Sequence, residues 1–495
     1  MKRICYLLLF AFLLCQLSHS QAIGGWQAFL SYYNTVKVAE TNDYVFAVAQ
    51  GAKVSANDTE QNGGSLFRYN KEDNSIKLFS RQDGLTDQQI THISFNNTTN
   101  TLLIIYKDGN MDLLVDNSFF NIPYLYDSSI KDKTINDIYF YNEYAYLSGN
   151  FGIMVLNLKK KEIADTYQIK KVITSTCIKD NYLYAATENG IYRGLLTSNL
   201  LDINNWQNFS VSINGSVEQL AIFKNQLCFK LKNGGTYYQD ENENIHTIIE
   251  GSNINKMKLV NNKLISFSSS TAYISSSLSD KDIVNIGTIN DISSLNDENT
   301  FWIAAGDQSI KGIKKNLNQY TVFFSDTIAA NSGPKRNLCE YMTVNNQRLF
   351  VAGGGRDANR YDNYGTFMIH NNESWTNYNE DAIKEKAGIK FSDVMSIAID
   401  PKDNNHYYVS TWGEGVFEFK DNSFVQLYNS NNSPLESAIA NSPNFIRIEG
   451  LCFDKDNNLW MTNSEVSSAL KVLKKDGTWA SLTYNDLNKV NSIDK

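Results

Sequence analysis

A unit of about 40 residues recurs along the chain, and each copy contains three short apolar stretches separated by polar turns. Aromatic and β-branched residues fill these stretches, as is typical of strands. A glycine precedes the third stretch of many copies, which suits a hairpin turn with positive φ. These glycines are Gly64, Gly109, Gly152, Gly190, Gly235, Gly365 and Gly415. Short-strand repeats of this period indicate an all-β propeller fold.

The spacing of the first strands predicts two rings. Seven first strands begin near Val36, Ile90, Ile135, Val172, Val217, Ile254 and Ile289. We therefore predict an N-terminal seven-bladed β-propeller over residues 21–328. Further first strands begin near Leu338, Val394 and Ile446, so residues 329–495 are predicted to be the first three blades of a second, incomplete propeller. The polar Gly/Pro stretch 326–338 is the predicted boundary.

Tryptophans suggest how the first ring closes. Trp206, Trp375 and Trp479 lie at the ends of units, where an outermost strand is expected. Trp26 begins a similar segment before the first unit, so residues 25–33 are predicted to supply the outer strand of the seventh blade. Such a clasp would cover sheet edges; the alternative is an unpaired arm. The chain is expected to be a fragment of a longer protein; the alternative is that a partner completes its second ring.

Residues 1–20 read as a secretory signal peptide, so the chain is predicted to be exported. Lys2 and Arg3 precede an apolar run from Ile4 to Cys15, and small residues before Gln21 suit cleavage. The run is shorter than the roughly 20 residues that span a bilayer. Lipidation at Cys15 is the alternative. The net charge of -8 argues against non-specific nucleic-acid binding, which requires a basic surface.

Four cysteines follow the signal peptide: Cys177, Cys228, Cys339 and Cys452. Their wide spacing contains no CxxC motif, and apolar residues flank Cys177 and Cys452. We expect buried free thiols, although an oxidising compartment permits disulfides. A short helix is predicted from Tyr378 to Ala387 within the eighth unit.

No catalytic, cofactor-binding or metal-binding residue is predicted, and the chain is not expected to be an enzyme. Gly353-Gly-Gly resembles a phosphate loop but opens no helix, so an elongated hairpin is preferred. Acidic turns at Asp400 and Asp454 offer oxygen ligands for calcium without the spacing of a calcium loop. Lys159–Lys161, with Lys170 and Lys171, could meet lipid or glycan phosphates; the alternative is a solvated sheet edge.

Several segments resemble the PorZ-type propellers of the type IX secretion system. They are Gly25-Trp-Gln-Ala-Phe-Leu-Ser-Tyr, Gly64-Ser-Leu-Phe-Arg-Tyr, Asp83-Gly-Leu-Thr-Asp, Asp108-Gly-Asn-Met-Asp-Leu-Leu and Phe151-Gly-Ile-Met-Val-Leu-Asn-Leu. The resemblance is dense over residues 24–170 and weaker from there to 495. Units such as Val394–Phe419 also resemble the "two-component regulator propeller" repeat, which hybrid sensor kinases share.

The resemblance implies a non-enzymatic component of an attachment complex at the periplasm and outer-membrane surface. Such a component delivers anionic lipopolysaccharide for cargo anchoring, and its expected partners are a PorU-like sortase and PorV/PorQ-like outer-membrane proteins. The family's plan adds a second complete propeller and a C-terminal sorting domain, which this sequence does not include. Asp326-Thr327-Ile328 resembles the O-glycosylation acceptor pattern of these bacteria, which makes Thr327 a candidate.

The resemblance assigns no ligand-binding residue. The alternative function is a periplasmic ligand-sensing propeller region of a hybrid two-component sensor. A propeller glycosidase or lyase would need convergent carboxylates at one mouth of the ring.

Overall fold

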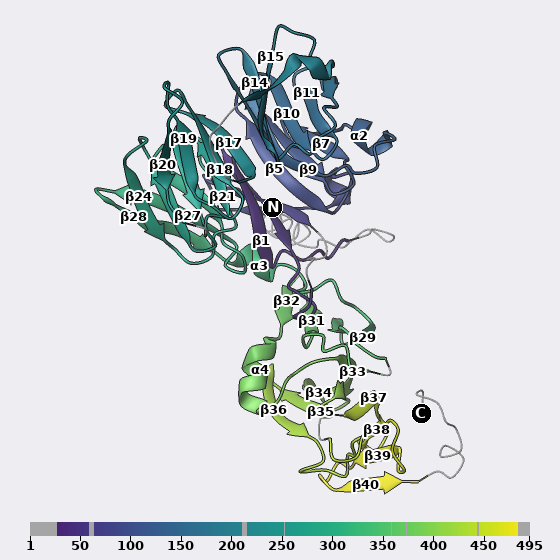
Figure 1. Ribbon diagram of the computed structural model, residues 1–495. Coiled ribbons are helices and arrows are strands. Elements are labelled where there is room, and N and C mark those ends of the chain that lie inside the picture. The colour runs from purple at the N-terminus through teal and green to yellow at the C-terminus, as the bar shows by residue number, and fades with distance from the viewer. Residues whose placement is uncertain are drawn as a thin grey trace, which may run out of the picture.

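The computed structural model describes residues 27–58, 64–209, 215–251, 253–357, 359–372, 374–442 and 445–483. The all-β prediction is confirmed, because antiparallel strands in four-stranded sheets make up most of these residues. Figure 1 shows two groups of sheets, the first coloured purple to teal and the second green to yellow. The predicted signal peptide and Trp26 lie outside the described residues.

The first unit contains seven four-stranded sheets, each ordered as its strands follow in the chain. Sheets 1 and 2 comprise β1 (Asn34–Glu40), β2 (Tyr44–Gln50), β3 (Ser65–Asn70), β4 (Ile76–Phe79), and β5 (Ile90–Asn96), β6 (Thr101–Tyr106), β7 (Met111–Val115), β8 (Ser118–Asn121). Sheets 3 and 4 comprise β9 (Ile135–Tyr141), β10 (Tyr144–Gly149), β11 (Gly152–Asn157), β12 (Glu162–Tyr167), and β13 (Ser175–Lys179), β14 (Tyr182–Thr187), β15 (Gly190–Leu195), β16 (Trp206–Phe209).

Sheets 5 and 6 comprise β17 (Val217–Phe223), β18 (Gln226–Leu231), β19 (Thr236–Gln239), β20 (Ile245–Ile249), and β21 (Lys256–Val260), β22 (Lys263–Phe267), β23 (Thr271–Ser275), β24 (Lys281–Asn285). Sheet 7 comprises β25 (Asp291–Ser293), β26 (Thr300–Ala304), β27 (Ile310–Asn316) and β28 (Gln319–Asp326). Short helices interrupt this unit at η1 (Arg81–Asp83), α2 (Tyr124–Asp127) and η2 (Ile203–Asn205).

Turn and core residues explain why this sequence forms sheets. Tight two-residue turns with positive φ at both residues join strand pairs, at Asp116-Asn117, Asp180-Asn181, Lys224-Asn225 and Asn261-Asn262. Turns of this kind match the twist of a hairpin, and Asn and Asp tolerate their φ values. Every residue of β6 is buried, because its sheet packs face to face against both neighbours. A strand buried on both faces is continuously apolar rather than alternating.

The recurring glycines meet two different requirements. Gly152 has φ +127, and a Cβ on it would also clash with the carbonyl oxygen of Tyr167. Gly235 has no positive φ, yet a Cβ there would clash with the carbonyl oxygen of Ile249 on the neighbouring strand. The predicted turn geometry is therefore correct at Gly152, whereas close backbone approach is the requirement at Gly235.

The first and last sheets of this unit are in contact. Thr35 and Gly306 form a β-bridge, with the Thr35 amide donating to the Gly306 carbonyl at 2.9 Å. One core cluster combines Val38 and Phe67 of sheet 1 with Trp302 of sheet 7. The prediction that residues 25–33 form the outer strand of the last sheet is wrong, because β28 occupies that edge.

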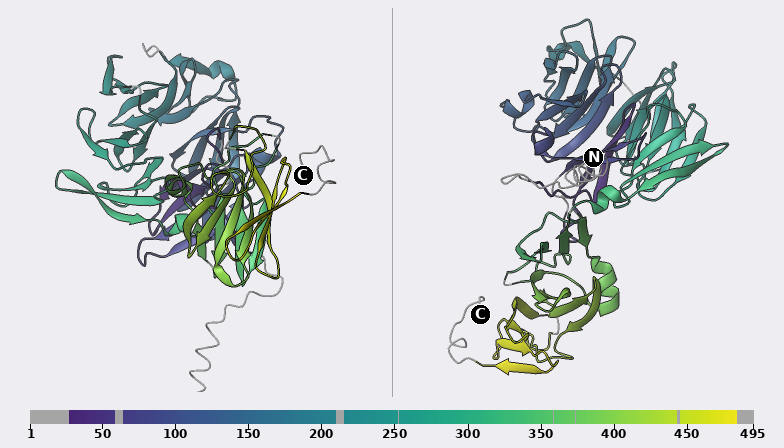
Figure 2. Two further views of the ribbon diagram at one scale, coloured as in Figure 1. Left: turned by 90° about the horizontal axis from the view of Figure 1, so that it is seen from below. Right: turned by 180° about the vertical axis from the view of Figure 1, so that it is seen from behind.

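Residues 27–33 instead run to the second unit. The Phe29 ring lies 4.6 Å from the ring of His370 and 5.5 Å from that of Trp375. The chain returns through α3 (Ile328–Asn331), which lies where the two groups of sheets meet (Figure 1). The right-hand view of Figure 2 shows from behind that the second unit adjoins the first near this point.

The second unit contains three groups of four strands. They are β29 (Tyr341–Asn345), β30 (Arg348–Ala352), β31 (Phe367–Asn371), β32 (Ser374–Asn377); β33 (Val394–Asp400), β34 (Asp403–Gly413), β35 (Val416–Lys420), β36 (Ser423–Tyr428); and β37 (Ile446–Phe453), β38 (Leu459–Asn463), β39 (Leu470–Leu473), β40 (Trp479–Leu482). The second and third groups join through a short β34–β37 pairing.

The predicted helix is confirmed as α4 (Glu380–Ala387). Asn379 caps it, because its side-chain oxygen accepts hydrogen bonds from the amides of Asp381 and Ala382. Gly388 ends it in the left-handed conformation, with φ +71. Among the described residues no helix has the length and apolar character needed to cross a membrane.

All four described cysteines are free thiols. Cys177 and Cys228 are buried, as predicted, whereas Cys339 and Cys452 are exposed. The prediction of burial is wrong for both exposed cysteines. Cys339 lies in the irregular segment between α3 and β29 rather than in a strand, and β37, which contains Cys452, has a bulge between Ile448 and Leu451. An extra residue reverses which side chains face the core, so Leu451 is buried and Cys452 points outward.

Candidate functional site

In each sheet of the first unit, one polar residue lies at the same position of the inner strand. It is the third residue of a four-residue pattern whose first residue is buried, as in Ile90-Thr-His-Ile and Ile289-Asn-Asp-Ile. The residues at this axial position are Lys37, His92, Asp137, Ser175, Gln219, Lys256 and Asp291. Together with Lys258, which follows on the same strand as Lys256, we call them the axial cluster.

Irregularities in the backbone orient these side chains toward the axis. A register shift immediately precedes Lys37, His92, Asp137 and Gln219 in their strands. A β-bulge redirects the side chain that follows it. In sheets 4, 6 and 7 the inner strand begins at the axial residue itself. The inner strands therefore present one polar side chain each toward a common axis.

Acceptor side chains of the axial cluster link neighbouring sheets. Ser175 donates its hydroxyl to Asp137 Oδ2 at 2.6 Å and accepts the amide of Leu220 at 3.1 Å. Gln219 Oε1 accepts the amide of Met257 at 2.5 Å. Asp291 Oδ2 accepts the amide of Val38 at 3.4 Å, across the junction of sheets 7 and 1. These hydrogen bonds therefore join sheet 3 to sheet 4, sheet 4 to sheet 5, sheet 5 to sheet 6 and sheet 7 to sheet 1.

Basic residues occupy the axial position in sheets 1, 2 and 6. Lys258 Nζ contacts Asp291 Oδ1 at 2.8 Å. Within the described part of the chain, neither Lys37 nor Lys256 has a carboxylate within 4.0 Å. The charge is therefore unbalanced on the side of the axis formed by sheets 6, 7 and 1.

The charges of these groups influence one another across the axis. Burial and the like charge of Lys256 together lower the pKa of Lys37 to about 7. Burial and the charges of Lys37 and Lys256 lower the pKa of His92 to about 3, so the imidazole is neutral at pH 7. His92 belongs to sheet 2 and Lys256 to sheet 6, so the influence acts across the axis.

The pKa values of the two carboxyl groups in the axial cluster shift in opposite directions. Burial alone would raise the pKa of Asp291, but the ammonium groups of Lys258, Lys256 and Lys37 lower it to about 2. Burial raises the pKa of Asp137, which Ser175 and more distant lysines only partly offset. The lysines thus stabilise a carboxylate at Asp291 far more than at Asp137.

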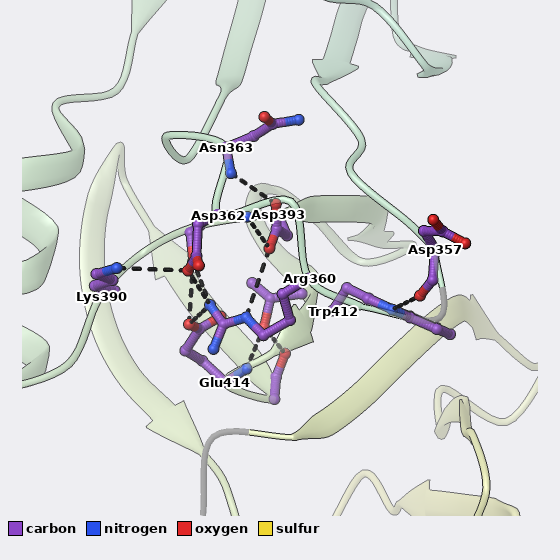
Figure 3. A network of polar contacts seen from close by, with 11 residues as sticks. Asp357, Arg360, Asp362, Asn363, Lys390, Asp393, Trp412 and Glu414 are labelled. Atoms are coloured by element: carbon purple, nitrogen blue, oxygen red, sulfur yellow. Dashed lines mark hydrogen bonds and ion pairs between the residues drawn. The ribbon is translucent and has the colours of Figure 1, made fainter. Parts of the chain in front are cut away.

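A second polar network lies in the second unit, on the long connection between β30 and β31. Arg360 donates to Ser392 Oγ at 2.6 Å and forms an ion pair with Glu414. Asp393 accepts the amides of Asp362 and Asn363 at 3.1 and 2.9 Å. Figure 3 shows these side chains converging from the loop and from the strands behind it. The loop is therefore held in place by polar contacts with Ser392, Asp393 and Glu414, which lie outside it.

Glu414 is the unusual group in this network. It is 1% exposed, and its Oε2 atom has no hydrogen-bond partner in the described structure. Burial raises the pKa of Glu414 to about 7, because the attraction of Arg360 offsets only part of the cost of desolvation. This carboxyl group changes its protonation state near neutral pH.

A family model described as "TSS9, PorZ, N-terminal beta-propeller domain" matches residues 61–207. The structure of PorZ from Porphyromonas gingivalis superposes on 93% of this chain with a TM-score of 0.83 and 27% sequence identity. The predicted resemblance to PorZ is confirmed. That protein is described as an essential bacterial surface component of the type IX secretion system. The present chain spans 60% of the PorZ chain.

Two other solved structures are less similar than PorZ. One is the extracellular domain of a one-component system from B. thetaiotaomicron, with 11% identity over 93% of this chain and 68% of that one, and a TM-score of 0.41. The other is the computationally designed Ika8 protein, with 12% identity over 66% of this chain and 96% of that one, and a TM-score of 0.38. No curated protein matches the chain by sequence.

Most of the residues singled out from the sequence lie apart from both networks, whereas Gly355 adjoins Asp393 of the second network. Thr327 is exposed between β28 and α3, and its glycosylation stays a prediction. Gly353–Gly355 open the connection between β30 and β31, which pair antiparallel, so the hairpin interpretation is confirmed. Asp454 accepts hydrogen bonds from the amide of Asn458 at 2.8 Å and from the indole of Trp460 at 2.8 Å. Those contacts explain an acidic residue there without calcium.

The basic cluster predicted from the sequence is divided. Lys159 and Lys160 are exposed in the turn between β11 and β12, while Lys161 Nζ lies 3.2 Å from the centre of the Phe120 ring. Lys161 also borders a shallow groove of about 800 Å³ beside Tyr124. Lys171 instead lies over Tyr192, at 4.8 Å. The axial residues were missed, although their recurring position in the four-residue pattern is visible in the sequence.

Proposed function

We propose that the chain is a non-enzymatic component of a type IX secretion system. The supporting observation is the similarity to PorZ, which extends over 93% of the chain. In this proposal the chain is exported through its N-terminal signal peptide and acts at the periplasm and outer-membrane surface. Its seven N-terminal sheets are then the blades of one seven-bladed propeller, and the later sheets begin a second.

The proposed task is to deliver anionic lipopolysaccharide to a PorU-like sortase for cargo anchoring, together with PorV/PorQ-like outer-membrane proteins. An acidic ligand requires cationic groups to bind it. The chain as a whole is acidic, with a net charge of -8. The unpaired lysines of the axial cluster supply local positive charge, which supports this task.

Deletion of the gene in the bacterium that encodes the chain tests this proposal. We expect secreted cargo to lose its surface anchor and to be released without attached lipopolysaccharide. Re-expression of the full reading frame should restore anchoring. Unchanged anchoring in the deletion strain would refute the proposal. A deletion that instead abolishes a transcriptional response to an external ligand would favour the sensor alternative.

A further inference from the structure

The residues of the axial cluster have two different roles. Asp137, Ser175, Gln219 and Asp291 accept hydrogen bonds that join neighbouring sheets. Lysine has three donors and no acceptor, so it can join sheets only by donating, as Lys258 does to Asp291 and to the Ile292 carbonyl. Among the described residues, the side chains of Lys37 and Lys256 donate to no acceptor of a neighbouring sheet, so their ammonium groups remain available for another partner.

Their arrangement is electrostatically unfavourable without an anion. Lys256 is the largest charged influence on Lys37, and it repels the Lys37 ammonium group. The charge of Asp291 offsets part of this repulsion, but its Oδ1 already binds Lys258 at 2.8 Å and its Oδ2 accepts the Val38 amide. Partly buried like charges remain costly until an opposite charge joins them.

The side chains of the site keep part of their solvent exposure. Lys37, Lys256 and His92 are only partly buried, and the Lys258 side chain retains 35% of its exposure. The neutral imidazole of His92 adds one N–H donor opposite the lysines. Ammonium groups bind phosphate and similar oxyanions as point charges.

We propose that the axis of the first unit binds an oxyanion, held by Lys37 and Lys256 with Lys258 and His92 completing the site. A phosphate or carboxylate group is the chemistry that this set recognises. The identification of its natural source as the acidic group of a lipopolysaccharide rests on the proposed function. The oxyanion site itself does not.

Sulfate is the appropriate probe, because it matches the phosphate dianion and does not titrate near neutral pH. Isothermal titration of the full chain with sulfate should show one saturable site. Replacing Lys37→Gln and Lys256→Gln should each weaken binding by about tenfold. Both replacements relieve repulsion between partly buried charges, so loss of folding is not the expected explanation, and circular dichroism checks this.

Two matched variants locate the anion. Lys160→Gln removes an exposed lysine and should leave sulfate affinity unchanged. Lys161→Gln removes the lysine beside the groove of about 800 Å³, and it should also have no effect. Sulfate binding that survives the Lys37 and Lys256 replacements, or that is lost in Lys161→Gln, would overturn the axial site, as would an absence of saturable binding.

Proton uptake provides an independent readout. An anion beside Lys37 favours its charged form, so sulfate binding near pH 7 should take up protons, and affinity should fall from about pH 6 to about pH 8. The other groups facing Lys37 are Lys256, Lys258, Asp291 and His92. Asp291 and His92 titrate well below this range, with pKa values of about 2 and about 3. Binding without proton uptake would contradict the role of Lys37.

Lipopolysaccharide in detergent micelles identifies the source of the anion. If the lysine replacements weaken its binding together with that of sulfate, the glycolipid supplies the oxyanion. If they weaken only sulfate binding, the site takes a free anion, and the oxyanion proposal stands without the glycolipid. Sulfate binding as predicted, combined with unchanged cargo anchoring in the deletion strain, would refute the proposed function but support this site.

Discussion

Glu414 shows how one buried carboxyl group can make stability depend on pH. Its pKa in the folded chain is about 7, above the ordinary value of 4.5. The folded state therefore binds a proton more tightly than the unfolded state. The resulting stabilisation is complete below the unfolded pKa and is lost as the pH rises through about 7.

We predict that replacing Glu414→Gln removes this dependence. The free energy of unfolding of the wild-type chain should fall by on the order of 2–3 kcal/mol between about pH 5 and about pH 8 through this group. The variant should show a much smaller decrease, and it should be more stable than the wild type at about pH 8. Urea unfolding at both pH values measures this.

Glu385→Gln serves as the control, because Glu385 is an exposed residue of α4. It should leave the pH dependence as in the wild type. If Glu414→Gln loses stability at both pH values, the ion pair with Arg360 outweighs the cost of burying the carboxylate, and the prediction fails.

At the scale of single elements, the glycines before the third strands distinguish two sources of strain. Gly152 and Gly190 both have positive φ, at +127 and +110. A Cβ at Gly152 would clash with the backbone of Tyr167, whereas nothing lies within 4 Å of a Cβ at Gly190. The two positions therefore share the conformational requirement and differ in the space available.

This pair yields a matched prediction. Gly190→Ala should destabilise the chain by about 1–2 kcal/mol, the cost of a left-handed conformation. Gly152→Ala should cost about 2 kcal/mol more, because the β11–β12 edge must shift. Thermal and urea unfolding compare the two. Equal losses would mean that backbone conformation alone makes glycine necessary at Gly152.

The sequence predicts strands and turns well because their signals are local. Apolar stretches, Asn- and Asp-containing turns and the capped helix after Tyr378 each depend on neighbours in the chain. The Cys452 prediction failed because the bulge before Leu451 depends on pairing with β38. The prediction that the segment around Trp26 forms the outer strand of sheet 7 failed because β28 pairs with β27 at that edge. The axial residues meet only after distant sheets assemble, so their repeated position carries no local signal of proximity.

At the scale of the whole molecule, the predicted boundary stretch packs between the two units. The Arg336 side chain is 3% exposed, donates to the Lys53 carbonyl at 2.6 Å and pairs with Glu380 at the start of α4. Lys335 also pairs with Glu380, at 2.5 Å. Beside these contacts, residues of both units line a cavity of about 220 Å³ that includes Asn57 and Tyr364. Arg336 thus connects the two units through its contacts with Lys53 and Glu380.

We predict that replacing Arg336→Met loosens the two units without unfolding either. Small-angle X-ray scattering should show a broader distribution of interatomic distances than in the wild type. Arg348→Met is the matched control, because Arg348 contacts Asn404 and Asn405 within the second unit. Identical scattering from the Arg336 variant and the wild type would show that other contacts hold the units together.

Acidification should act on the same junction. Burial alone would raise the pKa of Glu380, but Arg336 and Lys335 lower it below its ordinary value. A carboxyl group with a lowered pKa stabilises the folded state above its unfolded pKa, and that stabilisation is lost as the pH falls through its folded pKa. Scattering measured from neutral pH down to about pH 3 should show the junction loosen, whereas the network around Glu414 gains stability over the same range.

The contact between sheets 1 and 7 has a mechanical consequence. Thr35 meets Gly306 at that contact, and a few residues away Ser31 donates its hydroxyl to the Lys335 carbonyl at 3.2 Å. The strands that close the first unit are therefore continuous with the segments that hold the second. A force that pulls on the second unit is therefore transmitted in part to the contact between sheets 1 and 7, where side chains and the short Thr35–Gly306 bridge join the sheets, and we expect these contacts to yield before the hydrogen bonds within a sheet do.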